Sequence, residues 1–146
     1  MNNAVAILPA RGGSKRILRK NIKDFGGRPA MGWPIAAARA SGLFERVVVT
    51  TDKADIARVA VALGAEAPFL RDADLSDDHA GTTEVIRDAI ARLALGPDVA
   101  VCCIYPTALF IMAEDLAQGH NKLAEGADWV LSVGEYPTPI DRAYRM

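Results

Sequence analysis

The sequence predicts an α/β fold with a mainly parallel sheet and helices on both of its faces. Short apolar runs of strand length alternate about five times with longer segments of helical periodicity. The apolar runs do not alternate with polar residues, as expected for strands that are buried on both faces. The chain has 146 residues, of which 51% are hydrophobic, and this is enough for one core. We therefore expect residues 1–146 to form a single domain.

The first half of the chain has the pattern of a βαβ unit. An apolar strand is predicted at 4–8, and a second strand, rich in valine, at 47–50. The helix between them is predicted at 33–41, because a proline falls in its first turn and a glycine follows its end. The turn formers at 24–29 bring the preceding loop back to the protein.

The next helix is predicted from four apolar residues at helical spacing: Ile56, Val59, Ala60 and Leu63. Asp52 is placed to cap this helix. The segment 67–70 is predicted to be an edge strand, because its proline cannot donate a hydrogen bond to a central ladder.

The polar segment 71–83 is long for a plain connection and is therefore a candidate binding loop. We interpret His79 as solvated in preference to catalytic, because no serine or cysteine nucleophile motif accompanies it. Thr82 or Thr83 is expected to cap the helix that follows.

The last third of the chain is predicted to contain two strands and one helix. The apolar run 99–105 is expected to be a central strand in which Cys102 and Cys103 are buried thiols. A weaker helix is predicted at 114–124, and the last strand at 129–133.

A basic loop follows the first strand directly. Between Leu8 and Asn21 it carries five cationic side chains: Arg11, Lys15, Arg16, Arg19 and Lys20. Gly12 and Gly13 have no side chains to keep a ligand from the backbone, so their N–H groups and that of Ser14 could converge on an anion. Repulsion among so many like charges favours a polyanionic ligand such as a nucleoside triphosphate. The alternative is a solvated surface loop.

Two familiar phosphate-binding motifs do not occur in the sequence. A P-loop requires a lysine that precedes Ser or Thr, and here Ser14 precedes Lys15. The dinucleotide motif Gly-x-Gly-x-x-Gly does not fit either, because Gly12 and Gly13 are adjacent. Kinase, GTPase and NAD-dependent functions are therefore disfavoured.

The motifs of the chain resemble those of the CMP-sugar synthetase family, which includes the acylneuraminate and pseudaminic acid cytidylyltransferases. The resemblance begins at 10–15 and continues in chain order through further segments: 20–21, 49–52, 69–71, 75–78, 102–107 and 139–143. It covers nearly the whole chain, as the N-terminal part of longer family members. The last two segments are most similar to the pseudaminic acid branch.

This resemblance implies the fold of the nucleotide-diphospho-sugar transferases, with a Rossmann-like sheet. It implies transfer of CMP from CTP to a nonulosonic, sialic-acid-like sugar with nine carbons, pseudaminic acid in preference to neuraminic acid, with release of pyrophosphate. Mg²⁺ is the implied cofactor and a homodimer the implied assembly. We expect this chain to lack the family's C-terminal portion, with its metal-binding carboxylates. The sequence therefore does not decide whether this chain completes the reaction after it binds the nucleotide.

The resemblance also assigns the site residues. Arg11, Lys15 and Lys20 are expected to be the catalytic cations. The nucleotide is expected to be bound by Ala10, Gly12, Gly13, Ser14, Asn21, Arg71 and Tyr105. Asn21 would hold either the loop or the ribose, and Asp52 would lie near the active site as well as, or instead of, capping its helix. No residue can be named as a metal ligand.

Composition restricts the partners further. The formal net charge is −1, so the basic loop is not part of a general nucleic-acid-binding surface. No apolar run approaches the roughly 20 residues of a membrane span, and we expect a cytoplasmic protein. The Cys and His spacing predicts no zinc site.

Two other functions remain open from the sequence. One is a nucleotide-binding or phosphate-sensing module that binds a ligand without turnover. The other is a related cytidylyltransferase that acts on the eight-carbon sugar of lipopolysaccharide.

Overall fold

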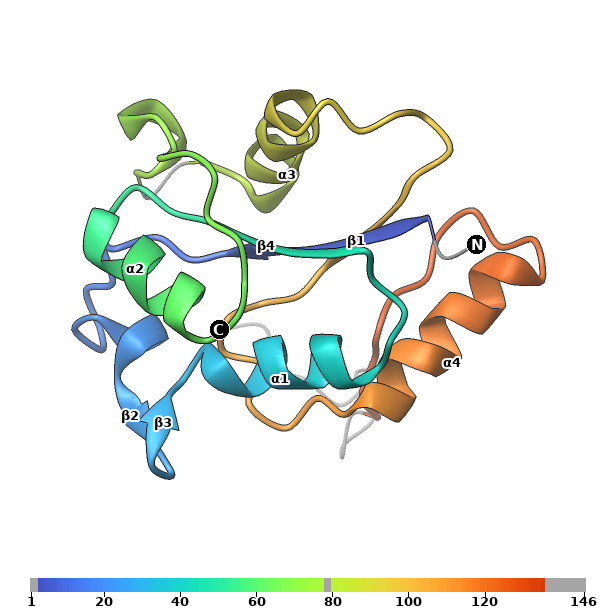
Figure 1. The fold of residues 1–146 in the computed structure, drawn as a ribbon, viewed down its shortest axis with the longest axis horizontal. Helices are drawn as coiled ribbons and strands as arrows, with labels where there is room; N and C mark the ends of the chain where they lie inside the picture. The colour runs from blue at the N-terminus through green and yellow to red at the C-terminus, as the bar shows by residue number, and fades with distance from the viewer. Residues whose placement is uncertain (1–2, 78–79, 136–146) are drawn as a thin grey trace, which may run out of the picture.

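The computed structural model describes residues 3–77 and 80–135 (Figure 1). Its main sheet has three parallel strands in the order β4-β1-β5, where β4 is Arg46–Thr50, β1 is Ala4–Pro9 and β5 is Ala100–Cys103. The predicted α/β class and parallel sheet are confirmed. Within the described ranges, no helix combines the length and the apolar character that crossing a membrane requires.

Helices cover both faces of this sheet, as the sequence predicts. Figure 1 shows α3 on one side of the strands and α1 with α4 on the other. The helices are α1 (Gly32–Ala40), α2 (Ala54–Ala62), α3 (Thr82–Arg92) and α4 (Ala113–Ala124). α1 and α4 lie within one residue of the starts and ends predicted for them.

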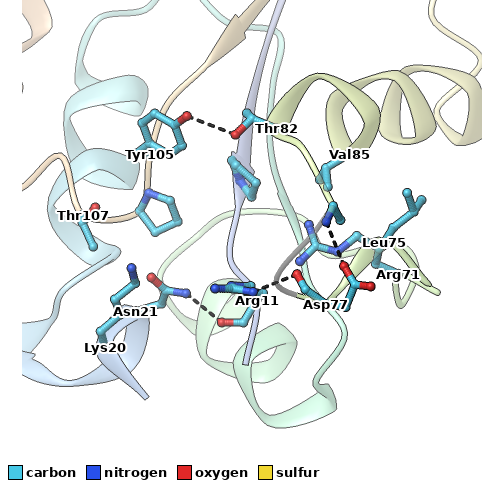
Figure 2. Close-up of a pocket in the computed structure, with 13 residues that line it drawn as sticks. Arg11, Lys20, Asn21, Arg71, Leu75, Asp77, Thr82, Val85, Tyr105 and Thr107 are labelled. Atoms are coloured by element: carbon cyan, nitrogen blue, oxygen red, sulfur yellow. Dashed lines mark hydrogen bonds between the residues drawn. The ribbon is translucent and has the colours of Figure 1, made fainter. Parts of the chain in front are cut away.

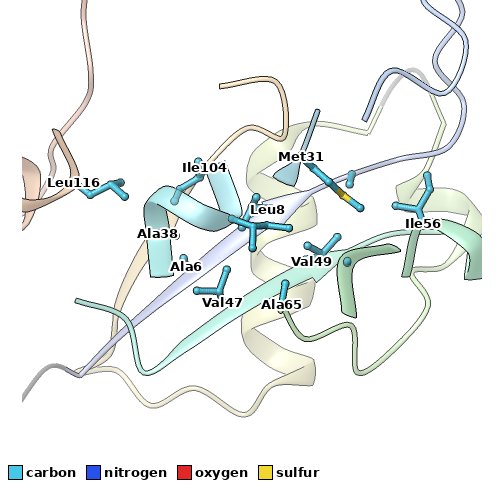
Figure 3. Close-up of a cluster of buried hydrophobic side chains, with 13 residues drawn as sticks. Ala6, Leu8, Met31, Ala38, Val47, Val49, Ile56, Ala65, Ile104 and Leu116 are labelled. Atoms are coloured by element: carbon cyan, nitrogen blue, oxygen red, sulfur yellow. The ribbon is translucent and has the colours of Figure 1, made fainter. Parts of the chain in front are cut away.

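The side chains of β1 alternate between two apolar clusters. Ala6 and Leu8 pack in the larger cluster, together with side chains of α1, α2 and α4 (Figure 3). Val5 and Ile7 point to the other face and pack with Ala89 of α3. Because β1 has a neighbouring strand on each side and a cluster on each face, it is the best-buried element of the described structure.

Between β1 and α1 the chain forms a small antiparallel hairpin of β2 (Asp24–Phe25) and β3 (Arg28–Pro29). The turn consists of Gly26 and Gly27, whose φ angles are 63° and 89°. A two-residue turn with both φ values positive matches the twist of hairpin strands and favours glycine at both positions. The predicted turn at 24–29 is confirmed.

Two of the predicted strands are wrong. The segment 129–133 pairs with no strand in the described structure, and Trp129 is 86% exposed. It follows α4, and a methyl carbon of Val130 lies near Gly119 of that helix. The segment 67–70 is also not a continuous strand: the chain touches β4 through isolated bridges at Glu66 and Leu70. Pro68 lies between these bridges and has no N–H to donate.

The prediction of a central strand at 99–105 is also wrong. In the described sheet β5 is shorter and lies at an edge, and β1 is central. As a result Cys103 is exposed and Cys102 is half-buried, so the expectation of two buried thiols fails for Cys103. Burial raises the pKa of Cys102 to about 11, which keeps its thiol protonated at neutral pH.

The structure also corrects two expected helix caps. The N-cap of α3 is Gly81 rather than Thr82 or Thr83, and the Gly81 N–H donates to Glu84 Oε2 over 3.0 Å. The N-cap of α2 is Lys53, one residue after Asp52. The Asp52 carboxylate instead accepts a hydrogen bond from the basic loop. His79 and the segment 136–146, which includes part of the family resemblance, lie outside the described residues.

Candidate functional site

A pocket of about 240 Å³ lies beyond the carboxyl ends of β1 and β5 (Figure 2). From β1 the chain crosses to β4 on one side, and it later returns to β5 on the other side. The gap between β1 and β5 is therefore the topological switch point of the sheet, where open α/β folds bind ligands. The pocket is lined by Pro9, Arg11, Lys20, Asn21, Arg71, Leu75, Asp77, Ala80, Thr82, Val85, Tyr105, Pro106 and Thr107.

The basic loop begins at the end of β1 and is held at both ends. The Ala10 N–H donates to the Thr50 carbonyl over 2.9 Å, which continues the ladder between β1 and β4. Asn21 lies in a short 3₁₀ helix (Lys20–Ile22) and is buried. Its Nδ2 donates to the Arg11 carbonyl over 3.0 Å, so Asn21 holds the loop, which is one of its two expected roles.

Arg11 connects the basic loop to the polar segment that follows β4. Its Nη1 donates to the main-chain carbonyl of Asp77 over 2.8 Å. The carboxylate of Asp77 accepts the Ala80 N–H at 2.8 Å, and both residues line the pocket. The guanidinium of Arg11 therefore stands in the wall of the pocket (Figure 2).

Arg71 carries the most deeply buried charge of the pocket, with 5% of the residue exposed. Its N–H donates to the Thr51 carbonyl over 2.8 Å, and its Nε donates to Ser76 Oγ over 3.2 Å. Burial lowers the pKa of Arg71 from its ordinary value, and the positive charge of Arg11 acts in the same direction. Asp52 partly offsets both effects. A buried cation of this kind is stabilised by an anionic ligand.

Two hydroxyl groups meet at the other end of the pocket. Tyr105 Oη and Thr82 Oγ1 lie 3.0 Å apart and share a hydrogen bond. Figure 2 shows this pair at the top of the view, above Lys20 and Asn21. Tyr105 follows β5 and Thr82 begins α3, so the bond joins two elements that are far apart in the sequence. The pocket thus has cations at one end and neutral hydroxyls at the other.

The structure brings five of the predicted site residues into the pocket wall: Arg11, Lys20, Asn21, Arg71 and Tyr105. The remaining five belong to the adjacent loop and do not line the pocket: Ala10, Gly12, Gly13, Ser14 and Lys15. The Ser14 N–H donates to the Gly12 carbonyl over 3.0 Å. Ser14 Oγ is buried and has no hydrogen-bond partner among the described residues.

Sequence reasoning missed several residues of the wall. Thr82, Leu75 and Asp77 fall in the candidate binding loop 71–83 without an individual binding role, and Val85 is expected only as an apolar residue of the helix that follows. The polar character of 71–83 did indicate this segment, and Leu75 belongs to its 3₁₀ helix (Ala73–Leu75). Periodicity gives no information on which of these side chains faces the pocket.

Comparison with known proteins places this arrangement in a family. The cytidylyltransferase family matches residues 5–139, which is most of the chain. This chain belongs to the cytidylyltransferase family. Pseudaminic acid cytidylyltransferase of Campylobacter jejuni is 42% identical to it over 143 residues, which make up 96% of this chain and 62% of the relative. N-acylneuraminate cytidylyltransferase A of Danio rerio is 38% identical over 88% of this chain and 29% of the relative.

Solved structures of other cytidylyltransferases share the fold. A CMP:2-keto-3-deoxy-manno-octonic acid synthetase in complex with CTP has a TM-score of 0.71 and 20% identity, over 84% of this chain and 48% of the other. A cytidylyltransferase of Leptospira borgpetersenii has a TM-score of 0.67 and 18% identity, over 86% of this chain and 50% of the other. The chain thus spans about half the length of these proteins.

Proposed function

We propose that this cytidylyltransferase chain binds CTP at the pocket between β1 and β5 and transfers CMP to an acidic nine-carbon sugar, with release of pyrophosphate. The observation that carries the proposal is the buried guanidinium of Arg71, which lines the pocket together with Arg11 and Lys20. Three cations in one pocket wall suit the triphosphate of a nucleotide. Support also comes from the Campylobacter jejuni relatives, which are named pseudaminic acid cytidylyltransferases.

In this proposal the protein acts mainly by positioning and charge neutralisation. The anomeric hydroxyl of the sugar attacks the α-phosphorus, and the bond from that phosphorus to the pyrophosphate breaks. Negative charge grows on the leaving group, where Arg11, Lys20 and Arg71 would stabilise it. Lys15 would reach the triphosphate from the exposed loop, and the backbone at Gly13 would border it. The N–H groups of Gly12 and Ser14 donate to Asp52 and to the Gly12 carbonyl, so the expectation that they converge on an anion is not met, and the Ala10 N–H donates to Thr50.

We infer the acceptor sugar from the names of the relatives described above. Two relatives that are 41–42% identical over 96% of this chain carry the name pseudaminic acid cytidylyltransferase. Two CMP-N,N'-diacetyllegionaminic acid synthases match only 61–63% of the chain. We therefore propose pseudaminic acid as the acceptor. The synthetase for the eight-carbon sugar is similar in fold, at 20% identity. A similarity at this level gives no information on the substrate of this chain.

A magnesium site is implied by the family resemblance but is not matched by the described residues. No three His, Cys, Asp or Glu side chains come together in the part of the chain that the structure describes. The carboxylate of Asp77, the acidic residue of the pocket wall, is engaged by the Ala80 N–H. The proposed mechanism therefore contains no step through the metal.

The test of this function measures CTP binding by calorimetry and pyrophosphate release on the same sample of the chain. Pseudaminic acid and N-acetylneuraminic acid are offered separately, with Mg²⁺ present. We expect CTP binding, and release with pseudaminic acid. Binding without release from either sugar would favour a nucleotide-binding module. A folded chain that binds no CTP would contradict the proposal.

Lys20 provides a direct test of the cationic wall. We expect Lys20→Ala to weaken CTP binding about 10- to 150-fold, because a charged hydrogen bond contributes about 1.5–3 kcal/mol. The matched control is Lys122→Ala, which removes an exposed lysine of α4 far from the pocket. Calorimetry should show unchanged affinity for this control. Equal affinity of the two variants would contradict a role for Lys20 in binding.

The variant Gly13→Ala tests whether phosphate approaches the backbone of the basic loop. An added Cβ at Gly13 would meet no atom within 4 Å, so Gly13→Ala fits the structure. We expect the unfolding free energy to stay the same or to rise by about 0.4–1 kcal/mol, because alanine restricts the unfolded chain. CTP affinity should nevertheless fall, because the methyl group would keep phosphate oxygens from the loop. Unchanged affinity in calorimetry would exclude Gly13 from the phosphate contact.

A further inference from the structure

We propose that Asp52 is a positioning residue that holds the basic loop from the β4 side. The Gly12 N–H donates to Asp52 Oδ1 over 2.8 Å. Asp52 follows β4 and does not line the pocket. This inference deepens the proposed function and, in its effect on CTP, rests on it.

The contact extends the ladder between β1 and β4 beyond the ends of the strands. In register, Pro9 is paired with Thr50, and the Ala10 N–H then donates to the Thr50 carbonyl over 2.9 Å. Two residues further on, a side-chain carboxylate takes the place of the main-chain carbonyl as acceptor for Gly12. Asp52 thus attaches the first turn of the loop to the sheet.

The Asp52 carboxylate is well placed for this role because both of its oxygens are engaged. The second oxygen lies 3.4 Å from Lys53 Nζ, and the Asp52 side chain is only 14% exposed. A carboxylate that accepts a backbone N–H forms a charge-assisted hydrogen bond, which is stronger than one between neutral groups.

The stem of the Lys53 side chain lies over Gly12. A Cβ at residue 12 would overlap Lys53 Cγ, so any larger residue there would require this exposed side chain to move. A second attachment lies nearby, where Arg19 pairs with Asp55 in the first turn of α2.

Fixing Gly12 also fixes Arg11, its neighbour in the chain. The Arg11 carbonyl is held by Asn21 on the pocket side, and Asp52 holds the next residue on the other side. The direction in which the Arg11 guanidinium enters the pocket depends on both attachments. Asp52 does not line the pocket, and it acts on ligand binding through Arg11, whose neighbour it holds, while its charge also acts on Arg71.

The test compares Asp52→Ala with Asp52→Asn. The asparagine keeps an oxygen that can accept the Gly12 N–H, and the alanine does not. Three quantities are measured on the whole chain: hydrogen exchange of the Gly12 amide by NMR, tryptic cleavage within 11–20, and CTP affinity by calorimetry. The matched control is Asp98→Ala, at the opposite end of the sheet, where Asn3 Nδ2 donates to the main-chain carbonyl and no side-chain hydrogen bond to another described residue is formed.

We expect Asp52→Ala to accelerate exchange of the Gly12 amide and loop cleavage about tenfold and to weaken CTP binding about tenfold, in line with one lost hydrogen bond. Asp52→Asn should recover part of each effect, because its amide oxygen accepts the Gly12 N–H without the charge of the carboxylate, and Asp98→Ala should change none. If the alanine variant does not fold, Asp52→Ser replaces it, because the serine hydroxyl is too short to reach Gly12.

Unchanged amide exchange in Asp52→Ala would overturn the proposal, and so would an asparagine variant as impaired as the alanine variant. A wild-type chain that binds no CTP would contradict the proposed function alone. The exchange of the Gly12 amide would then still decide whether Asp52 holds the loop.

Discussion

Replacing Arg71 with methionine is expected to weaken CTP binding about 10- to 150-fold without unfolding the chain. The guanidinium is buried in the pocket wall, and in the described structure its side chain makes one hydrogen bond, to Ser76. Loss of a charged partner for the triphosphate removes about 1.5–3 kcal/mol. The fold should tolerate the change, because an apolar side chain of similar length removes the desolvation free energy that a buried charge costs.

Calorimetry with CTP and urea denaturation on the same samples would check this expectation. Arg71→Lys should recover only part of the affinity, because lysine keeps the charge and loses the planar set of donors. The matched control is Arg46→Met. Arg46 begins β4, at the opposite end of the sheet, and pairs with Glu66. If Arg71→Met and Arg46→Met bound CTP equally well, the assignment of Arg71 would be wrong.

The second large effect concerns stability. We expect Leu8→Ala to lower the free energy of unfolding by about 2–5 kcal/mol, because Leu8 is fully buried in the larger apolar cluster. Domains of this kind have a total stability of about 5–15 kcal/mol, so the variant should be close to unfolding. Urea denaturation followed by circular dichroism measures the difference.

Leu18→Ala is the matched control for this variant. Leu18 lies in the basic loop and is 78% exposed, so the same truncation should change the unfolding free energy by no more than about 0.5 kcal/mol. A loss at Leu8 as small as that at Leu18 would mean that the end of β1 does not pack as the structure shows.

Much of the fold can be predicted from the sequence, because the spacing of apolar residues indicates which side chains are buried. The apolar run at β1 and the valine run at β4 predict strands buried on both faces, and the two observed clusters explain why. The four helices are indicated by apolar spacing and by the glycines that follow them. Gly42 and Gly64, for example, have φ angles of 65° and 87° after α1 and α2.

The predictions were wrong where contacts between residues distant in the sequence determine the local structure. The residues at 129–133 have a strand-like composition, but strand formation requires a partner edge, which a sequence pattern does not specify. Asp52 has the residue type of an N-cap, yet its carboxylate bonds to Gly12, which is 40 residues away in the chain. Local propensity cannot predict a competition with so distant a donor.

The candidate site, like the fold, can be predicted only in part from the sequence. The motifs predict site roles for Arg11, Lys20, Asn21, Arg71 and Tyr105, which come from three separate segments and line one pocket. The sequence does not predict the bond between Tyr105 and Thr82, because this bond depends on where α3 begins relative to the end of β5. Residue type indicates the chemistry of a site, whereas the sheet order determines which residues are neighbours.

The origin of the pocket wall has a consequence for the whole domain. A ligand that contacts Arg11, Arg71 and Tyr105 at once ties together three stretches of chain without any covalent bond, much as a removable cross-link would. Its binding free energy is then available only to the folded chain, so ligand concentration and resistance to unfolding are linked. Occupancy of the pocket would set how firmly β1, β5 and the segment that begins at Arg71 stay together.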